Sequence, residues 1–292
     1  MERMLIIGCG DIARRTIRLL GKNYRICALI RNGTQRDGLR TQGVLPVMGD
    51  LDDRKSLSRI TGLADIVLHL APPPNSGAKD VRTRHLLAAL SKGSLPRQFI
   101  YISTSGVYGD CAGAWVNETH TVNPQSARAQ RRVDAESQIR RWARVNGVRA
   151  SILRVPGIYA EDRLPLERLR AGMPAIAADE DSYTNHIHAD DLARIVVAAL
   201  HRGRSNRVYH ASDDGVMKMG DYFDVVADAH HLPHPRRISR AEAQRAIPES
   251  MLSFMNESRR LTNSRMKQEL QVRLNHPTVK HFLKDTVHDT FA

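Results

Sequence analysis

The chain has 292 residues, 41% of them hydrophobic, which is enough for one large domain or for one domain with a smaller lobe. No run of about 18 apolar residues occurs, so we expect no membrane span. The N-terminus shows no basic segment followed by an apolar one, so we expect no secretory signal. Cys9, Cys27 and Cys111 lie far apart, without metal-ligand spacing or a disulfide framework, and we expect a cytoplasmic protein.

The net charge of +13 raises the hypothesis of a nucleic-acid partner. The positive charge is spread along the chain, and its densest cluster, on an expected helix, is interrupted by Asp134 and Glu136. We therefore do not expect nucleic acid as the main partner. A surface suited to phosphate-bearing ligands, or arginine-rich codon usage, explains the charge equally well. The cluster consists of Arg128, Arg131, Arg132, Arg140, Arg141 and Arg144.

Short apolar runs alternate with helical segments through about residue 165. We expect strands at 4–8, 25–30, 44–48, 65–70, 98–103 and 150–155, and helices near 11–21, 53–60, 79–92 and 125–146. In the third helix, Leu86, Leu87 and Leu90 recur at helical spacing and should face the sheet. This alternation predicts an α/β fold with a doubly wound parallel sheet, the Rossmann fold.

The pattern changes after residue 165. We expect a loop at 172–185, a helix at 188–201 that Asp190 or Asp191 caps, and a strand at 207–210. From residue 213 the sequence is polar and helical. We therefore expect a dinucleotide-binding domain over 1–165, to which 186–212 return. A smaller, mainly helical substrate-binding lobe would comprise 166–185 and 213–292.

A glycine-rich turn follows the first expected strand. Gly8 permits a tight turn, Gly10 lets the backbone approach a pyrophosphate, and Ala13 is small enough for close helix packing. The helix that follows offers free N–H groups and the positive end of its dipole to phosphates. The sequence thus predicts a dinucleotide cradle, formed by Gly8, Cys9, Gly10, Asp11 and Ile12.

The second expected strand ends on Arg31, where an acidic residue would bind the 2′-hydroxyl of NAD. A guanidinium there pairs with a 2′-phosphate, and Arg14 could reach the same group. The alternative is that both arginines are solvated surface residues. We expect NADP (NADPH) to be favoured over NAD, with Asn32 beside Arg31.

Residues that follow the third and fourth strands complete the expected cofactor site. Asp50 and Leu51 are placed to flank the adenine, although Asp50 could instead cap the helix near 53. Pro72-Pro73-Pro74 cannot extend the fourth strand and forces a loop at the carboxyl edge, where open α/β sheets bind ligands. Leu70, Ala71 and Pro72 are therefore expected in the cofactor site.

Three further motifs occur in order: Ser103-Thr104-Ser105-Gly106-Val107-Tyr108-Gly109, Arg154-Val155-Pro156-Gly157-Ile158-Tyr159 and His186-Ile187-His188-Ala189-Asp190-Asp191. Over nearly its whole length the chain resembles the extended short-chain dehydrogenase/reductases, closest to the atypical members described as NAD-dependent epimerase/dehydratase-like. The resemblance implies that Thr104 polarises a substrate carbonyl or hydroxyl, with Ser103 or Ser105 as substitutes, and that Pro156 flanks the nicotinamide carboxamide. Alternatively, the hydroxyls satisfy backbone groups, and the Pro-Gly pair ends a strand.

The Tyr-x-x-x-Lys pair of that superfamily is missing. Aligned on Glu136, the tyrosine position holds Arg128 and the lysine position holds Arg132, and no tyrosine in the sequence has a lysine four residues later. Arginine stays protonated near neutral pH and cannot serve as a general acid or base. We expect Arg128 to hold an acidic group or an oxyanion, and Arg132 to hold ribose hydroxyls.

Three functions compete. The first is hydride transfer with a proton from Tyr108, His186 or His188, and with Asn185 and His186 near the substrate. The second is a catalytically silent NADP(H)-binding redox sensor, and the third acts on nucleic acid through the arginine cluster. We favour an oxidoreductase or epimerase/dehydratase-like enzyme for a small hydroxyl- or carbonyl-bearing substrate, which Arg128 suits if it is anionic.

The sequence leaves the substrate and the assembly, monomer or homodimer, open. It predicts no metal site, because His230, His231 and His234, with His210 upstream, lack a recognised ligand spacing.

Overall fold

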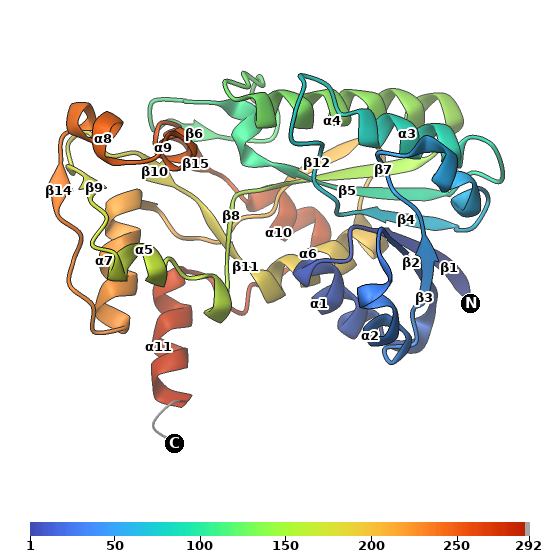
Figure 1. Cartoon of the computed structure of the whole chain (residues 1–292), viewed down its shortest axis with the longest axis horizontal. Helices are drawn as coiled ribbons and strands as arrows, with labels where there is room; N and C mark the ends of the chain where they lie inside the picture. The colour runs from blue at the N-terminus through green and yellow to red at the C-terminus, as the bar shows by residue number, and fades with distance from the viewer. Residues whose placement is uncertain (290–292) are drawn as a thin grey trace.

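A computed structural model describes residues 1–289 and places seven strands in one parallel sheet (Figure 1). The strand order is β12-β7-β5-β4-β1-β2-β3, so the order reverses between β1 and β4. The predicted α/β fold and parallel sheet are confirmed, and each predicted strand agrees with the structure to within two residues at either end. The seven strands are β1 (Glu2–Ile7), β2 (Tyr24–Ile30), β3 (Leu45–Met48), β4 (Ile66–His69), β5 (Gln98–Thr104), β7 (Arg149–Val155) and β12 (Arg207–His210).

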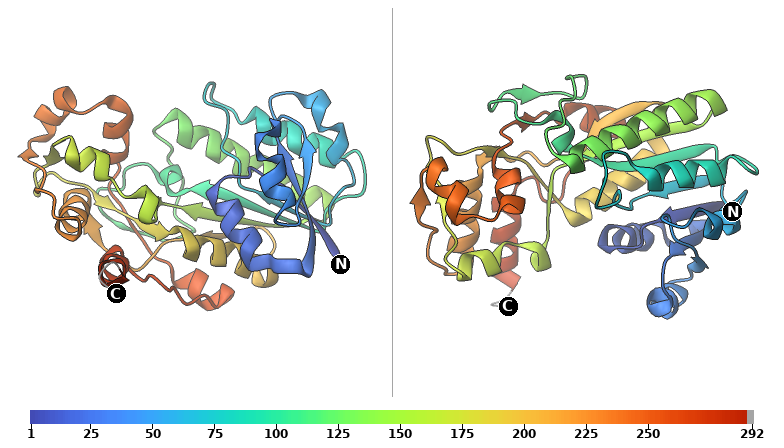
Figure 2. Two further views of the ribbon diagram at one scale, coloured as in Figure 1. Left: turned by 60° about the horizontal axis from the view of Figure 1, so that its bottom comes forward. Right: turned by 45° about the horizontal axis from the view of Figure 1, so that its top comes forward.

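Helices cover both faces of the sheet (Figures 1 and 2). One face packs against α1 (Asp11–Leu20), α6 (Ala189–Arg202) and α10 (Ser264–Leu270). The other packs against α3 (Val81–Leu90), α4 (Ala127–Asn146) and the 3₁₀ turn η3 (Arg54–Ile60). Successive β1 residues alternate between the two cores, Met4 and Ile6 in one and Leu5 and Ile7 in the other. Burial on both faces explains why these strands read as continuous apolar runs.

The α3 leucines behave as their spacing predicts. Leu86, Leu87 and Leu90 are buried in the core beneath α3 and α4, so the predicted orientation of this helix is confirmed. The short helix α2 (Arg36–Arg40) contacts β3 at the far edge of the sheet.

Three local predictions differ from the structure. Residues 54–60 form a 3₁₀ turn rather than an α-helix, and Asp53 caps it by accepting from Lys55 N. The cap of α6 is His188, whose Nδ1 accepts from Asp190 N at 3.2 Å, rather than Asp190 or Asp191. The predicted loop 172–185 contains two short strands, because each finds a partner strand far away in the sequence.

A smaller, mainly helical lobe lies beside the carboxyl edge of the sheet and has its own apolar core (Figure 1). Its helices are α5 (Leu166–Arg170), α7 (Met219–Ala229), α8 (Arg240–Ala246), α9 (Glu249–Met255) and α11 (Val279–Asp289). Short strand pairs are β9 (Ala175–Ile176) with β14 (Arg237–Ile238), β10 (Tyr183–Thr184) with β13 (Met217–Lys218), β8 (Gly157–Tyr159) with β11 (His186–His188), and β6 (Trp115–Val116) with β15 (Arg260–Leu261). The remaining 3₁₀ turns are η1 (Gly21–Asn23), η2 (Gly33–Gln35), η4 (Ser105–Tyr108) and η5 (Glu161–Arg163). Within residues 1–289, no helix combines the length and the apolar character that crossing a bilayer requires.

Candidate functional site

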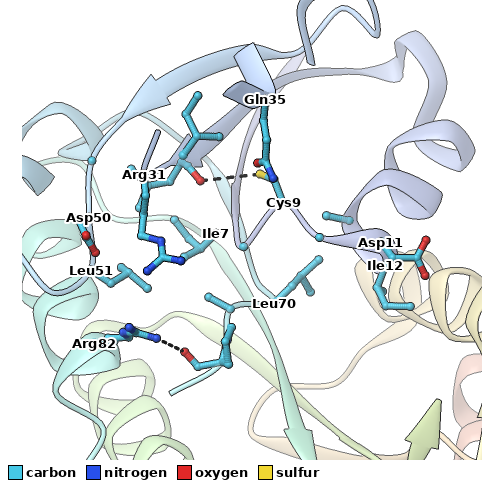
Figure 3. A pocket seen from close by; sticks show the side chains of 18 of the residues that line it. Ile7, Cys9, Asp11, Ile12, Arg31, Gln35, Asp50, Leu51, Leu70 and Arg82 are labelled. Carbon is cyan, nitrogen blue, oxygen red and sulfur yellow. Dashed lines mark hydrogen bonds between the residues drawn. The ribbon is translucent and has the colours of Figure 1, made fainter. Parts of the chain in front are cut away.

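A cavity of about 370 Å³ opens at the carboxyl ends of β1, β2 and β4, where the strand order reverses (Figure 3). Open α/β sheets bind ligands at this place. The structure brings eleven of the predicted cofactor residues together here, namely Gly8, Cys9, Gly10, Asp11, Ile12, Arg31, Asp50, Leu51, Leu70, Ala71 and Pro72. The other lining residues are Ile7, Ala13, Leu29, Ile30, Gln35, Gly49, Arg82 and Arg163.

The two glycines of the turn have different roles. Gly8 has φ +92°, and a Cβ there would lie 2.5 Å from the nitrogen of Ala71, so only glycine fits. Gly10 has nothing within 4 Å of its Cβ position and lines the cavity. The backbone at Gly10 therefore offers open space to a ligand at the N-terminus of α1.

Three charged side chains surround that helix terminus. Arg15 Nε donates to Asp11 Oδ1 at 2.9 Å, and Arg163 Nη2 lies 3.2 Å from Asp11 Oδ2. Arg163 belongs to η5, which precedes the helices of the smaller lobe, so it brings a positive charge from that lobe to the cavity. Beneath the turn, burial raises the pKa of the Cys9 thiol to about 11, which keeps Cys9 a neutral packing residue.

At the other end of this cavity, the Arg31 side chain points inward from the end of β2 (Figure 3). Arg31 also lines an adjoining cavity of about 360 Å³, together with Lys55, Ser56, Ser58 and Arg59. Asp50 lines both cavities, and its Oδ1 accepts from Asp52 N at 3.0 Å. The adjoining cavity therefore contains three cationic side chains and two hydroxyls besides one carboxylate.

Four predicted cofactor residues lie outside these cavities, namely Arg14, Asn32, Arg132 and Pro156. Arg14 is exposed on α1, and Asn32 is exposed with its Oδ1 accepting from Thr34 Oγ1 at 2.7 Å. Asp52, which the sequence did not indicate, is paired with Arg82 at 2.6 Å, and hydrogen bonding to that guanidinium lowers the pKa of the Asp52 carboxyl.

A second cavity, of about 290 Å³, lies between the ends of β5 and β7 and the smaller lobe. It gathers Thr104, Ser105, Arg128, Pro156, Asn185 and His186, all of which were named from the sequence. Gly106, Gly157 and Ile158, which belong to the same motifs, also line it, and the structure adds Tyr183, Thr184, Met219, Tyr222, Phe254, Glu257 and Arg259.

The Thr104 hydroxyl hydrogen-bonds to the backbone, and Thr104 also lines the second cavity. Its Oγ1 accepts from Gly106 N at 3.2 Å, which caps η4 and fixes the rotamer, while its own proton stays available for a ligand oxygen. Ser105 Oγ lies 3.5 Å from Arg259 Nη2. Ser103 is buried and lines neither cavity.

Arginines dominate the charge of the second cavity. Arg128 lies with its guanidinium carbon 3.9 Å from the centroid of the Phe254 ring, and burial lowers its pKa while Glu257 opposes that shift. Arg259 is buried, with Nη1 2.9 Å from Glu257 Oε2 and 2.8 Å from Gly109 O. Two guanidinium groups thus face one carboxylate, which leaves net positive charge for an anionic group.

His186 forms part of the wall. Its ring stacks on Tyr222 with centroids 4.2 Å apart, and burial lowers the pKa of His186 to about 4. The imidazole is therefore neutral near pH 7, with one nitrogen able to donate and the other able to accept.

The other two proton-donor candidates line neither cavity. Tyr108 is buried, where Arg154 Nη1 donates to its hydroxyl oxygen at 2.7 Å and the hydroxyl lies 2.5 Å from His210 Nε2. His188 is buried at the start of α6. Arg132 lines neither cavity, because Nη1 donates to the hydroxyl of Tyr101 at 2.9 Å and to Ile102 O at 2.8 Å.

The arginine cluster on α4 is divided among structural contacts rather than gathered into one stripe. Arg131 is buried and donates to Gly77 O at 2.7 Å, and Arg140 donates to Asn206 O at 3.2 Å. Arg128 faces the second cavity.

Of the histidines considered for a metal, His234 is paired with a carboxylate. His234 Nε2 lies 2.6 Å from Asp228 Oδ1. Over residues 1–289, side-chain ligand atoms of His276, His281 and Asp285 come within 4.8 Å of one another, and His281 Nδ1 already pairs with Asp285 Oδ2 at 3.0 Å.

Several lining residues had no signal in the sequence. Arg163, Glu257 and Arg259 lie far from the glycine turn and from Thr104 in the chain, and no motif marks them. Residues 257–259 reach the second cavity because β15 pairs with β6, a contact between Arg260 and Trp115 that spacing alone does not predict.

Comparison with known proteins agrees with this architecture. The family model for NAD-dependent epimerases and dehydratases matches residues 4–212, and the chain therefore belongs to the NAD-dependent epimerase/dehydratase family. It is 28% identical over 191 residues to a dTDP-glucose 4,6-dehydratase of Mycobacterium tuberculosis, a match that covers 58% of this chain and 57% of that enzyme. The chain thus spans little more than half the length of that relative.

Solved structures resemble it over nearly the full length. A protein of unknown function from Silicibacter pomeroyi has 27% identity and a TM-score of 0.80, with 100% of both chains covered. A UDP-glucuronic acid 4-epimerase from Bacillus cereus in complex with NAD has 19% identity and a TM-score of 0.75, with 99% and 97% covered. At that identity, the second likeness shows a shared fold alone.

Proposed function

We propose that the chain binds NADP(H) in the cavity at the glycine turn and catalyses hydride transfer on a hydroxyl- or carbonyl-bearing substrate in the second cavity. The observation that carries this proposal is the open backbone at Gly10, on the same cavity as the inward-pointing Arg31. The family membership and the NAD complex of the Bacillus cereus enzyme support a dinucleotide as the ligand.

The residues around the turn fit a diphosphate. Backbone N–H groups at the start of α1 donate to phosphate oxygens, and Arg163 adds a guanidinium from the smaller lobe. The Asp11 carboxylate would repel the diphosphate, but Arg15 and Arg163 neutralise it on both sides.

Preference for NADP over NAD follows from the charges at the adenosine end. Arg31 directly follows β2, where an acidic residue would bind the ribose of NAD, and Lys55 and Arg59 share the adjoining cavity with it. These cations suit a 2′-phosphate, whereas a ribose 2′-hydroxyl gains little from them.

The second cavity would hold the reacting part of the substrate. The nicotinamide supplies hydride acceptance or donation when it is bound. Thr104 donates to the substrate oxygen, and Arg128 stabilises negative charge that develops there or holds an acidic substituent. His186 lines this cavity and exchanges the proton, which Arg128 cannot do because a guanidinium keeps its protons near neutral pH.

A redox sensor without turnover is the second candidate. Arg128 at the tyrosine position favours it, because the described residues of the cavity contain no tyrosine–lysine pair of that spacing. Both candidates require NADP(H) binding and differ in turnover alone.

Oxidation of NADPH with a panel of aldehydes and ketones separates the two. We expect turnover in the wild-type protein, a loss of at least about 100-fold in Thr104→Ala, and near-normal turnover in Ser105→Ala as the matched control. Unchanged melting temperatures show that both variants fold. Tight NADPH binding with no turnover on any member of the panel would favour the sensor.

A further inference from the structure

A third cavity, of about 820 Å³, lies in the smaller lobe between η5, α5, α7 and α9. Four of the chain's nine methionines line it, and of its twelve other lining residues six are apolar and six are charged. Methionine is flexible and polarisable and adapts to apolar ligands of varied shape. We name this cavity the methionine groove, after Met173, Met219, Met251 and Met255, which line it with Phe223, Phe254, Leu164, Pro165, Leu166 and Ala171.

The methionine groove adjoins the candidate active site. Met219 and Phe254 line both the groove and the second cavity, and Arg163 lines both the groove and the dinucleotide cavity. On α9, Met251 is 40% exposed and Phe254 is 54% exposed, so this apolar wall is open to a ligand. A molecule whose reactive oxygen contacts Thr104 would therefore have its tail directed along this wall.

Arg168 lies among the apolar lining residues, and its guanidinium has weak hydrogen-bond partners. Arg168 is half-buried 4.6 Å from the Phe223 ring centroid, and its Nη1 faces the sulfur atoms of Met173 and Met251. Its Nη2 donates to Pro174 O, while its Nε is buried with no hydrogen-bond partner in the described chain. Sulfur is a poor acceptor, so this cation lacks the anion that would normally accompany it.

Other charges in the groove lie at its rim. Glu161, Asp162 and Glu167 are exposed to water, as are Arg163 and Arg170, so these charges are solvated and screened. Of the charged lining residues in the described chain, Arg168 is the one that is half-buried rather than exposed, so its charge is the least screened by water.

We propose that the substrate is an apolar organic acid, with an aliphatic or aryl chain in the methionine groove and a carboxylate on Arg168. Its hydroxyl or carbonyl group would reach Thr104 through the junction at Met219 and Phe254. This inference rests on the proposed function for the reaction, but binding of the chain and the carboxylate can be measured without any coenzyme.

The test is calorimetric titration of the coenzyme-free protein with straight-chain carboxylates of six, eight, ten and twelve carbons. Each added methylene that is buried should tighten binding about fourfold, and the acid should bind about tenfold tighter than the alcohol of equal length. In Arg168→Gln the acid and the alcohol should bind alike, with Arg144→Gln on exposed α4 as the matched control. In Met251→Asp the gain per methylene should fall.

Binding that ignores chain length, or an acid preference that survives Arg168→Gln, would overturn the proposal. Absence of binding together with a dimer that Met251→Asp dissociates in sedimentation would assign the groove to a second copy of the chain and overturn it too. If the acids bind as expected but NADPH does not bind at all, the proposed function fails while the groove assignment stands.

Discussion

Arg163 Nη2 lies 3.2 Å from Asp11 Oδ2, and this pair joins the smaller lobe to the N-terminus of the first helix. Asp11 is the first residue of α1, so its carboxylate interacts favourably with the helix dipole but would repel the diphosphate of the proposed coenzyme. Arg163 lines both the dinucleotide cavity and the methionine groove.

Replacing Arg163 by alanine should weaken NADPH binding about tenfold, because one charge-assisted hydrogen bond to the diphosphate is lost and Arg163 no longer balances the negative charge of Asp11. Calorimetric titration measures this. Arg18→Ala, which removes an exposed arginine of α1, is the matched control and should bind as the wild type does. Equal affinities in all three proteins would remove Arg163 from the diphosphate site.

Arg31→Ala should weaken NADPH binding about tenfold and leave NADH binding unchanged, since only NADPH carries the 2′-phosphate. Titration of both coenzymes into wild-type and variant protein gives the ratio. Arg25→Ala, an exposed arginine at the opposite end of β2, serves as the control. A loss of affinity that is equal for both coenzymes would contradict recognition of the 2′-phosphate by Arg31.

The buried pair of Arg154 and Glu136 should matter for stability. Arg154 Nη2 lies 2.7 Å from Glu136 Oε2, and both side chains are 5% exposed. Arg154→Met leaves the carboxylate unpaired and should lower the free energy of unfolding by about 3–5 kcal/mol. The double variant Arg154→Met, Glu136→Leu should recover most of that loss in urea unfolding, and failure to recover would contradict the unpaired-charge explanation. Arg3→Met, which breaks an exposed pair with Asp65, should change little.

Stability should fall on acidification between about pH 6.5 and pH 4. Burial lowers the pKa of His186 and His188 to about 4 and that of His69 and His210 to about 3. The unfolded chain therefore takes up protons in this range that the folded chain does not, and each net proton costs about 1.4 kcal/mol per pH unit. Urea unfolding from pH 4.5 to pH 8 checks the slope, and a flat profile would contradict it.

Asp213 should change the stability in the opposite direction on acidification, so it serves as a control. Burial raises its pKa to about 7, so the folded chain holds this proton between about pH 4 and pH 7 while the unfolded chain has released it. This contribution to stability is lost as the pH rises through 7. Asp213→Asn should therefore stabilise the protein at pH 8 relative to the wild type and make its loss of stability on acidification steeper.

The sheet and the glycine turn could be predicted from the sequence because both depend on local patterns. Strands buried on both faces give continuous apolar runs such as Met4–Ile7, and a tight turn at positive φ requires glycine at position 8. Thr104 and Arg128 were named through the resemblance to the short-chain dehydrogenase/reductases, which places one after β5 and the other on α4.

The remaining parts of the site depend on tertiary contacts. Arg163 reaches Asp11 across 152 positions of the chain, and Arg259 reaches Gly109 because β15 pairs with β6. Tyr108 is the opposite case. Its motif made it a proton-donor candidate, but its hydroxyl is buried in contact with Arg154 and His210. Neither result follows from periodicity or spacing.

The most direct test of the account is calorimetric titration of NADPH into the wild-type protein and into Gly10→Val. Gly10 has φ −80°, and nothing lies within 4 Å of its Cβ position, so the variant should keep the wild-type melting temperature. Its side chain would occupy the space for the diphosphate, and we predict tight binding by the wild type and at least a 100-fold loss in the variant. Equal binding by both proteins, or no binding by the wild type, would contradict the central claim that the cavity at the glycine turn holds the coenzyme.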